Sequence, residues 1–252
     1  MYRNIQANAL EQYPLHIAVD SVRDGGVDVL TEPLNWLIRN GPGIHAPDAY
    51  GRLPLHYAFI AIGEECVDES EKSIDPVAVV SVLEHAMERD KLDWPDLRGN
   101  TPLHYAARRD ANVCAVTLLG RGCQLDRLNK KRNTPLGIAV LYRNEACTLT
   151  LIQAKSDVAI QVTSENKLDK VDDERWVWIP KRSKHQLPME CSSLVSLVVR
   201  NGWQAIIYVI LNILGKNERT IGELLRAALQ YRTYNLASTL LTALSQIVNE
   251  GE

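Results

Sequence analysis

The chain has 252 residues, a formal net charge of −3, and 46% hydrophobic against 23% charged residues. These proportions are ordinary for a folded, soluble protein and weigh against a chain built to bind nucleic acid. The longest apolar run, from Trp203 to Leu214, is too short to span a bilayer and predicts a buried helix instead. No basic-then-apolar leader follows Met1, and the five cysteines include no C-x-x-C pair, which favours reduced thiols in an intracellular protein.

A six-residue phrase recurs through the first half of the chain. Its copies are Y-P-L-H-I-A, L-P-L-H-Y-A, T-P-L-H-Y-A and T-P-L-G-I-A, beginning at Tyr13, Leu53, Thr101 and Thr134. Each predicts the start of a helix, because a proline at the first helical position loses no hydrogen bond and a preceding threonine can cap the helix. The last two copies begin 33 residues apart, so the phrase marks a repeated structural unit.

Each phrase is preceded by a turn and followed by a second, more apolar helix. Asp96 and Gly99 predict a tight turn in which glycine takes a positive φ, and Gly122 is expected just beyond the second helix. In the fourth repeat Asn129 and Arg132 replace the turn aspartate and glycine. We expect repeats at about 8–41, 48–90, 96–124, 129–155, 187–215 and 217–247, forming a single domain over 1–252.

Two insertions interrupt this pattern. Residues 63–75 are rich in Asp and Glu and predict a solvated acidic loop between the helices of the second repeat. Residues 155–190 show no helical period and separate the fourth repeat from the fifth. The second insertion contains Trp176 and Trp178. Their rings either bind a partner from an exposed segment or pack back onto the fourth repeat.

The phrase and its period resemble the ankyrin repeat, and the resemblance covers most of the chain, most closely in the second to fourth repeats. It implies an all-α ankyrin-repeat solenoid of about six helix-turn-helix repeats. It also implies that His16, His56 and His104 tie neighbouring turns through hydrogen bonds rather than bind metal. With no catalytic, metal or cofactor motif found, we expect no enzymatic activity and no cofactor in this chain.

In the family, partner contacts come from the turn tips and from the exposed side of each first helix. Carried over to this sequence, these positions are Tyr50, Arg52, Arg98, Asn100, Arg108, Arg109, Lys130, Lys131 and Tyr142. Most of those in the third and fourth repeats are cationic, which predicts a local basic patch on the concave surface of a slightly acidic chain. Arginine suits carboxylate and phosphate groups, so we expect an acidic or phosphorylated peptide as partner.

Three functions follow from the resemblance. The first is a non-catalytic protein–protein interaction module in the cytoplasm or nucleus, with neither nucleic acid nor membrane insertion expected. The second is the targeting domain of a larger enzyme, such as a tankyrase-like poly-ADP-ribosyltransferase, a kinase or a ubiquitin ligase. The third is a transcription regulator of the inhibitor-of-NF-κB type, which would need a large obligate interface.

Overall fold

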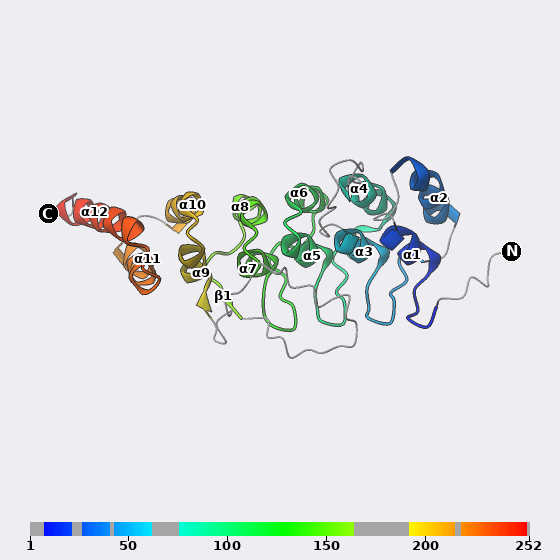
Figure 1. Cartoon of the computed structure of the whole chain (residues 1–252), viewed down its shortest axis with the longest axis horizontal. Coiled ribbons are helices and arrows are strands. Elements are labelled where there is room, and N and C mark those ends of the chain that lie inside the picture. Colours follow the sequence, from blue (N-terminus) through cyan, green and yellow to red (C-terminus); the bar gives the residue numbers. More distant parts are fainter. Residues whose placement is uncertain are drawn as a thin grey trace. The chain divides into compact units, whose positions relative to one another are not determined.

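The computed structural model describes residues 8–21, 27–40, 43–61, 76–163, 192–214 and 218–250. Within these ranges the chain forms twelve α-helices, one 3-10 helix and two very short strands, so the prediction of an all-α fold is confirmed (Figure 1). In chain order the elements are α1 (Pro14–Ser21), α2 (Val27–Asn40), α3 (Pro54–Ala61), α4 (Pro76–Ala86), η2 (Arg89–Lys91), α5 (Pro102–Arg108), α6 (Asn112–Gly120), α7 (Pro135–Leu141), α8 (Glu145–Gln153), β1 (Gln161–Val162), β2 (Ser192–Ser193), α9 (Leu194–Asn201), α10 (Gln204–Leu214), α11 (Glu218–Gln230) and α12 (Tyr234–Glu250).

The chain divides into two compact units, and each is described by itself. The first unit contains residues up to 130 together with 134–156, and the second contains 131–133 together with the chain from residue 157 onward. The expectation of one domain over 1–252 stays a prediction. The acidic loop at 63–75, like Trp176 and Trp178, lies outside the described residues.

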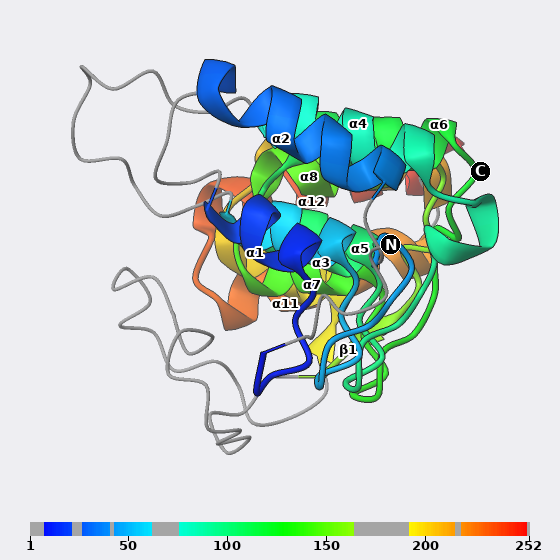
Figure 2. The ribbon, with the colours of Figure 1, turned by 90° about the vertical axis from the view of Figure 1, so that its right-hand side faces the viewer.

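The first unit has an inner and an outer row of helices. The inner helices α1, α3, α5 and α7 pack each on the next, and the outer helices α2, α4, α6 and α8 do the same above them (Figure 2). The leucine that follows the phrase proline is buried in every copy, at Leu15, Leu55, Leu103 and Leu136. This period gives each helix pair one apolar face for each neighbour, so the core is continuous through the unit.

The turns that precede the inner helices share one backbone conformation. The residue three places after the leading Asn or Asp has a positive φ in all four: 56° at Glu11, 75° at Gly51, 79° at Gly99 and 62° at Arg132. The predicted glycine turn at Gly99 is therefore confirmed, and Arg132 takes the conformation of the glycine it replaces. Arginine and glutamate do so at a steric cost that glycine avoids.

Adjacent turns are joined through their backbones. The amide of Ala49 donates to the Leu10 carbonyl at 3.0 Å, and the amide of Leu97 donates to the Tyr50 carbonyl at 2.9 Å. One repeat further on, the Lys130 amide donates to the Arg98 carbonyl at 2.9 Å. These hydrogen bonds fix the spacing between the turn tips, independently of the side chains that the tips carry.

The second unit contains two further helix pairs, in which α9 packs against α10 and α11, and α11 packs against α12. Strands β1 and β2 pair antiparallel, with Gln161 opposite Ser193, and lead into α9. Residues 155–163, which lie within the predicted insertion, thus include a strand. Asn133 and Thr163 also exchange two hydrogen bonds of 2.8 Å, which attach this segment to the preceding turn.

Three glycines of the first unit separate the energetic effects of backbone conformation and close packing. A Cβ at Gly99 would lie 2.9 Å from the Lys130 backbone nitrogen, at a φ of 79°, whereas Gly122 has a φ of 89° in open space. Gly120 is helical and equally open. We expect Gly99→Ala to lower the free energy of unfolding by more than about 2 kcal/mol, and Gly122→Ala to lower it by about 1 kcal/mol.

The control is Gly120→Ala, which should leave the free energy of unfolding unchanged or raise it by up to about 1 kcal/mol. Urea unfolding monitored by circular dichroism measures all three differences. Equal losses at Gly99 and Gly122 would show that the contact between adjacent turns contributes nothing.

Candidate functional site

The histidines of the repeated phrase hold the inner helices to their turns. In each, the ring nitrogen Nδ1 accepts a hydrogen bond from the backbone amide three residues earlier: Tyr13 to His16 at 3.1 Å, Leu53 to His56 at 3.0 Å and Thr101 to His104 at 3.1 Å. The other ring nitrogen of His16, Nε2, lies 3.0 Å from the Arg52 carbonyl of the next turn. The predicted tie between neighbouring turns is therefore confirmed for His16.

The fourth repeat lacks this histidine and is capped differently. Thr134 precedes α7 with extended backbone, and its hydroxyl accepts a hydrogen bond of 3.1 Å from the amide of Gly137. The Thr101 side chain accepts from the third residue of α5 in the same way, so α7 keeps this half of the cap and has glycine where the imidazole would make the other half.

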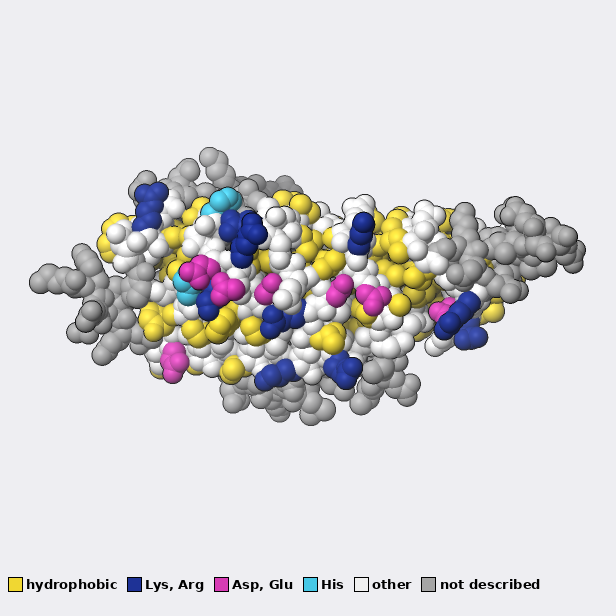
Figure 3. Space-filling model, turned by 180° about the vertical axis from the view of Figure 1, so that it is seen from behind, with side chains coloured by type: hydrophobic (Ala, Val, Ile, Leu, Met, Phe, Trp, Pro, Cys, Tyr) yellow, Lys and Arg dark blue, Asp and Glu magenta, His cyan; other side chains and the backbone are white. Residues whose placement is uncertain are grey.

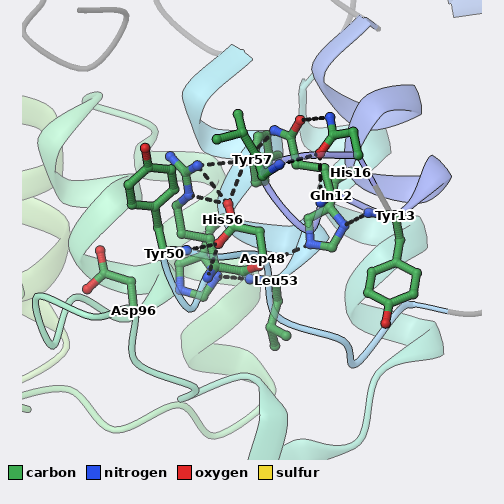
Figure 4. Close-up of polar contacts among 12 residues, drawn as sticks. Gln12, Tyr13, His16, Asp48, Tyr50, Leu53, His56, Tyr57 and Asp96 are labelled. Atoms are coloured by element: carbon green, nitrogen blue, oxygen red, sulfur yellow. Dashed lines mark hydrogen bonds and ion pairs between the residues drawn. The ribbon is translucent and has the colours of Figure 1, made fainter. Parts of the chain in front are cut away.

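A buried carboxylate organises the second turn (Figure 4). Asp48 Oδ1 accepts hydrogen bonds from the backbone amides of Tyr50 at 2.9 Å and Arg52 at 2.7 Å. Its other oxygen, Oδ2, accepts from the Arg52 guanidinium and from the Tyr57 hydroxyl, both at 2.7 Å. The Tyr57 hydroxyl in turn accepts from Gln12 of the first repeat at 2.7 Å, so this network joins two repeats.

The electrostatics of this network favour a charged carboxylate. Burial alone would raise the pKa of the Asp48 carboxyl, but the hydrogen bonds from Arg52 and Tyr57 outweigh it and lower the pKa. Burial also raises the pKa of the Tyr57 hydroxyl well above its ordinary value, so this group remains a hydrogen-bond donor. The turn therefore keeps one fixed charge pair, between Asp48 and Arg52.

Arg52 was predicted to contact a partner, and the structure gives its guanidinium another role. Its side chain is only 4% exposed, and its guanidinium lies 4.5 Å from the Tyr50 ring centroid and 4.8 Å from that of Tyr57. Because the Asp48 carboxylate and both rings already surround it, we place Arg52 in the framework that supports the surface. Tyr50 remains half-exposed beside it.

The third turn repeats this arrangement with an amide in place of the guanidinium. Asp96 accepts hydrogen bonds from the backbone amides of Arg98 and Asn100, at 2.8 and 2.7 Å, and from the Tyr105 hydroxyl at 2.8 Å. The Asn100 side-chain oxygen accepts from Asn129 of the next turn at 2.9 Å. Asn100 is thus half-buried and joins two turns, rather than projecting from one.

Several of the predicted binding residues do reach the surface. Arg98 and Lys130 are exposed, Lys131 is half-buried, and the neighbouring Leu97 is 59% exposed. The hydrogen bond between the Lys130 amide and the Arg98 carbonyl places these two cationic residues on adjacent turns. The turns of the third and fourth repeats therefore present positive charge at a fixed spacing.

The inner helices bring two further predicted residues together. Arg108, at the end of α5, places its guanidinium 4.7 Å from the ring centroid of Tyr142, which follows α7. Arg108, Arg109 and Tyr142 are all half-buried. Stacking on an aromatic ring fixes the plane of a guanidinium, so the Tyr142 ring orients the Arg108 side chain.

The described part of the surface carries charges of both signs. Among the side chains that Figure 3 colours, Lys and Arg are interspersed with Asp and Glu. Across the described ranges, no group of three or more His, Cys, Asp or Glu side chains is arranged to hold a metal ion. None of the described helices is both long and apolar enough to cross a bilayer.

Comparison with known proteins identifies the repeated unit. Residues 77–162 match a sequence model that describes three copies of ankyrin repeats. The chain is 35% identical over 251 residues to the poly(ADP-ribose) polymerase tankyrase of Caenorhabditis elegans, an alignment covering 93% of this chain and 11% of that protein.

Two further relatives share shorter regions. The ankyrin repeat protein OPG189 of variola virus is 22% identical over 60% of this chain and 24% of its own length. Human inversin is 35% identical over 35% of this chain and 7% of its own length. The chain therefore spans less than a quarter of the length of each relative named here.

The buried histidine of the second repeat makes stability depend on pH. Burial lowers the pKa of His56 to about 4 from 6.5, and the charge of Asp96 offsets this only in part. The His56 imidazole therefore binds a proton below about pH 6.5 in the unfolded chain, but only near pH 4 in the folded chain. The free energy of unfolding is therefore highest above the pKa that His56 has in the unfolded chain. It decreases as the pH falls from there toward the pKa that His56 has in the folded chain.

We expect protonation of His56 in the unfolded chain to lower the free energy of unfolding by about 2 kcal/mol when the pH falls from about 7.5 to about 5. The matched variant is His56→Asn, whose side-chain oxygen can still accept from the Leu53 amide but does not titrate. Urea unfolding at both pH values should show a smaller decrease in the free energy of unfolding for the variant. Some decrease should remain in both proteins, because burial also lowers the pKa of His16. An identical pH dependence in the two proteins would contradict this assignment.

Proposed function

The chain belongs to the ankyrin-repeat family, whose repeats mediate protein–protein interaction without catalysis, and we propose that this one binds an acidic or phosphorylated peptide. The peptide would contact the turns and inner helices of the second to fourth repeats in the first unit. The observation that carries the proposal is the placement of Arg98, Arg108 and Lys130 on elements whose spacing is fixed.

Rigidity supports this assignment. The turn tips are joined by backbone hydrogen bonds, and the buried carboxylates of Asp48 and Asp96 hold each turn in shape. A partner that binds a preformed surface does not have to order it, so less of the interaction energy is lost. An extended segment with anionic groups could contact several turns at once.

Charge and aromatic character support the same class of partner. Arg108 is oriented by the Tyr142 ring, and Tyr50 stands half-exposed next to the buried Arg52. Arginine offers paired N–H donors to carboxylate or phosphate oxygens, and tyrosine provides a flat contact area at low entropic cost. The cations would chiefly set the association rate and the specificity.

A second proposal concerns the context in which this surface works. The similarity to tankyrase covers 93% of this chain but 11% of that protein. This supports the proposal that the chain is the recruiting region of a longer poly(ADP-ribose) polymerase inside the cell, delivering bound partners to a catalytic part elsewhere. The sequence of the complete polypeptide decides between this and a free-standing module.

Charge reversal at the inner helices tests the proposed peptide site. We expect Arg108→Glu with Arg109→Glu to weaken binding by about a hundredfold or more, because a repelled anion replaces an attracted one. The probes are two fluorescein-labelled peptide pools, one with phosphoserine at a fixed position among Asp and Glu, the other with serine there. Fluorescence anisotropy measures both dissociation constants.

The matched control reverses the same number of charges outside the proposed site, with Arg39→Glu in α2 and Arg89→Glu in η2, and should leave the dissociation constants unchanged. A second test, Arg98→Glu with Lys130→Glu, changes two exposed turn residues and should weaken binding without loss of thermal stability. Tight binding by the Arg108/Arg109 variant, or equal loss in the control, would remove the proposal.

A further inference from the structure

Adjacent turns of the first unit meet in pairs of residues, and the chemistry of these pairs changes along the row. The carbonyl two places after the leading Asp of one turn accepts a hydrogen bond from the amide one place after the leading Asp or Asn of the next turn. Tyr50 is thereby paired with Leu97, and Arg98 with Lys130, each at 2.9 Å. The turns project beneath the inner helices (Figure 1), so these two pairs follow one another at the turn tips.

The pair formed by Tyr50 and Leu97 is apolar. The Leu97 side chain is 59% exposed, and the Tyr50 side chain is half-exposed. The Arg52 guanidinium lies 4.5 Å from the Tyr50 ring centroid and is paired with Asp48, so it orients the ring without adding net charge to the turn. Both residues of the pair stand in internal repeats, and together they offer a partner an apolar contact area that is already in place.

The next pair, Arg98 and Lys130, is cationic. Both side chains are exposed, and among the described residues neither belongs to an ion pair. The fourth turn begins with Asn129 where the second and third begin with aspartate, so no carboxylate at its base offsets the charge of Lys130. Two exposed cations on adjoining tips attract an anionic group to this point of the row.

The distance between the two pairs is one repeat. Neighbouring packed helices such as α3, α5 and α7 lie about 8 to 10 Å apart, and the turn tips follow the same spacing. A polyproline II segment has three residues per turn and rises about 3.1 Å per residue, so side chains three positions apart point the same way about 9 Å from each other. In a β-strand, side chains three positions apart point to opposite faces.

We propose that the partner presents a large apolar side chain and, three residues away, an acidic or phosphorylated one, on an extended segment with polyproline II backbone. The apolar side chain contacts Tyr50 and Leu97, and the anionic group contacts Arg98 and Lys130. The anionic half of this contact rests on the function proposed above, whereas the apolar half and the separation are new. Charge complementarity fixes the register, because an apolar side chain placed over the two cations would desolvate them without compensation.

Fluorescein-labelled peptides that hold the two side chains at different separations test this pairing. Each peptide contains one leucine and one phosphoserine in a frame of Pro and Ser, separated by one to six positions and in both orders. We expect the dissociation constant, measured by fluorescence anisotropy, to be lowest at a separation of three in one of the two orders. Replacing the leucine of that peptide by serine should weaken binding by about tenfold, because an apolar contact is lost.

Variants of the protein locate the apolar contact. Leu97→Ala should weaken binding of the leucine peptide by about tenfold and leave its serine counterpart unchanged, as expected for two groups that contact each other. The variant keeps the backbone amide that donates to Tyr50, so the turns stay joined. The matched control, Val116→Ala at a valine of α6 that is 55% exposed, should change neither dissociation constant.

Two outcomes would overturn the inference while leaving the proposed function in place. One is binding of phosphoserine peptides with no preference for leucine at a separation of three, including a preference for two or four. The other is an equal effect of Leu97→Ala on the leucine and serine peptides. If no phosphoserine peptide bound more tightly than its unphosphorylated form, both the inference and the proposed function would be overturned.

Discussion

The structure depends on a carboxylate that accepts backbone hydrogen bonds at the base of a turn. Asp48 and Asp96 each accept two backbone amides and a tyrosine hydroxyl within their own repeat. These contacts hold the turn closed. The closed turn places the amide of Ala49 or Leu97 against a carbonyl of the preceding turn. The spacing of the turn tips thus follows from buried charge and backbone, which leaves the outward side chains free to vary among repeats.

That division explains how similar repeats can carry different chemistry. The residue four places after the turn Asn or Asp is glutamine at 12, arginine at 52 and asparagine at 100, and each side chain makes a hydrogen bond within its turn or to the next turn. The tip residues, by contrast, range from Leu10 and Tyr50 to Arg98. The proposed recognition surface consists of the turn tips and the ends of the inner helices, where a change of side chain leaves the backbone bonds between turns in place.

Much of this was predictable because the repeated phrase combines local signals that agree with one another. The prolines at 14, 54, 102 and 135 begin helices, and Gly99 adopts the positive φ expected of it. The burial of Arg52 was not predictable from its place in the turn, because it depends on Asp48, Tyr50 and Tyr57 meeting in space. The regular structure within residues 155–163 was also not predicted. It depends on two hydrogen bonds between Asn133 and Thr163, which no local sequence pattern encodes.

The proposed recognition surface is preformed, since the bonds between the turns do not depend on a partner. Native-state hydrogen exchange of the Leu97 and Lys130 amides tests it, since these donors join adjacent turns through bonds of 2.9 Å. We expect protection comparable with that of the amides within α5 and α7, because the turns open only when the repeats separate. Exchange close to the rate of an unprotected amide, with α5 and α7 still protected, would contradict it.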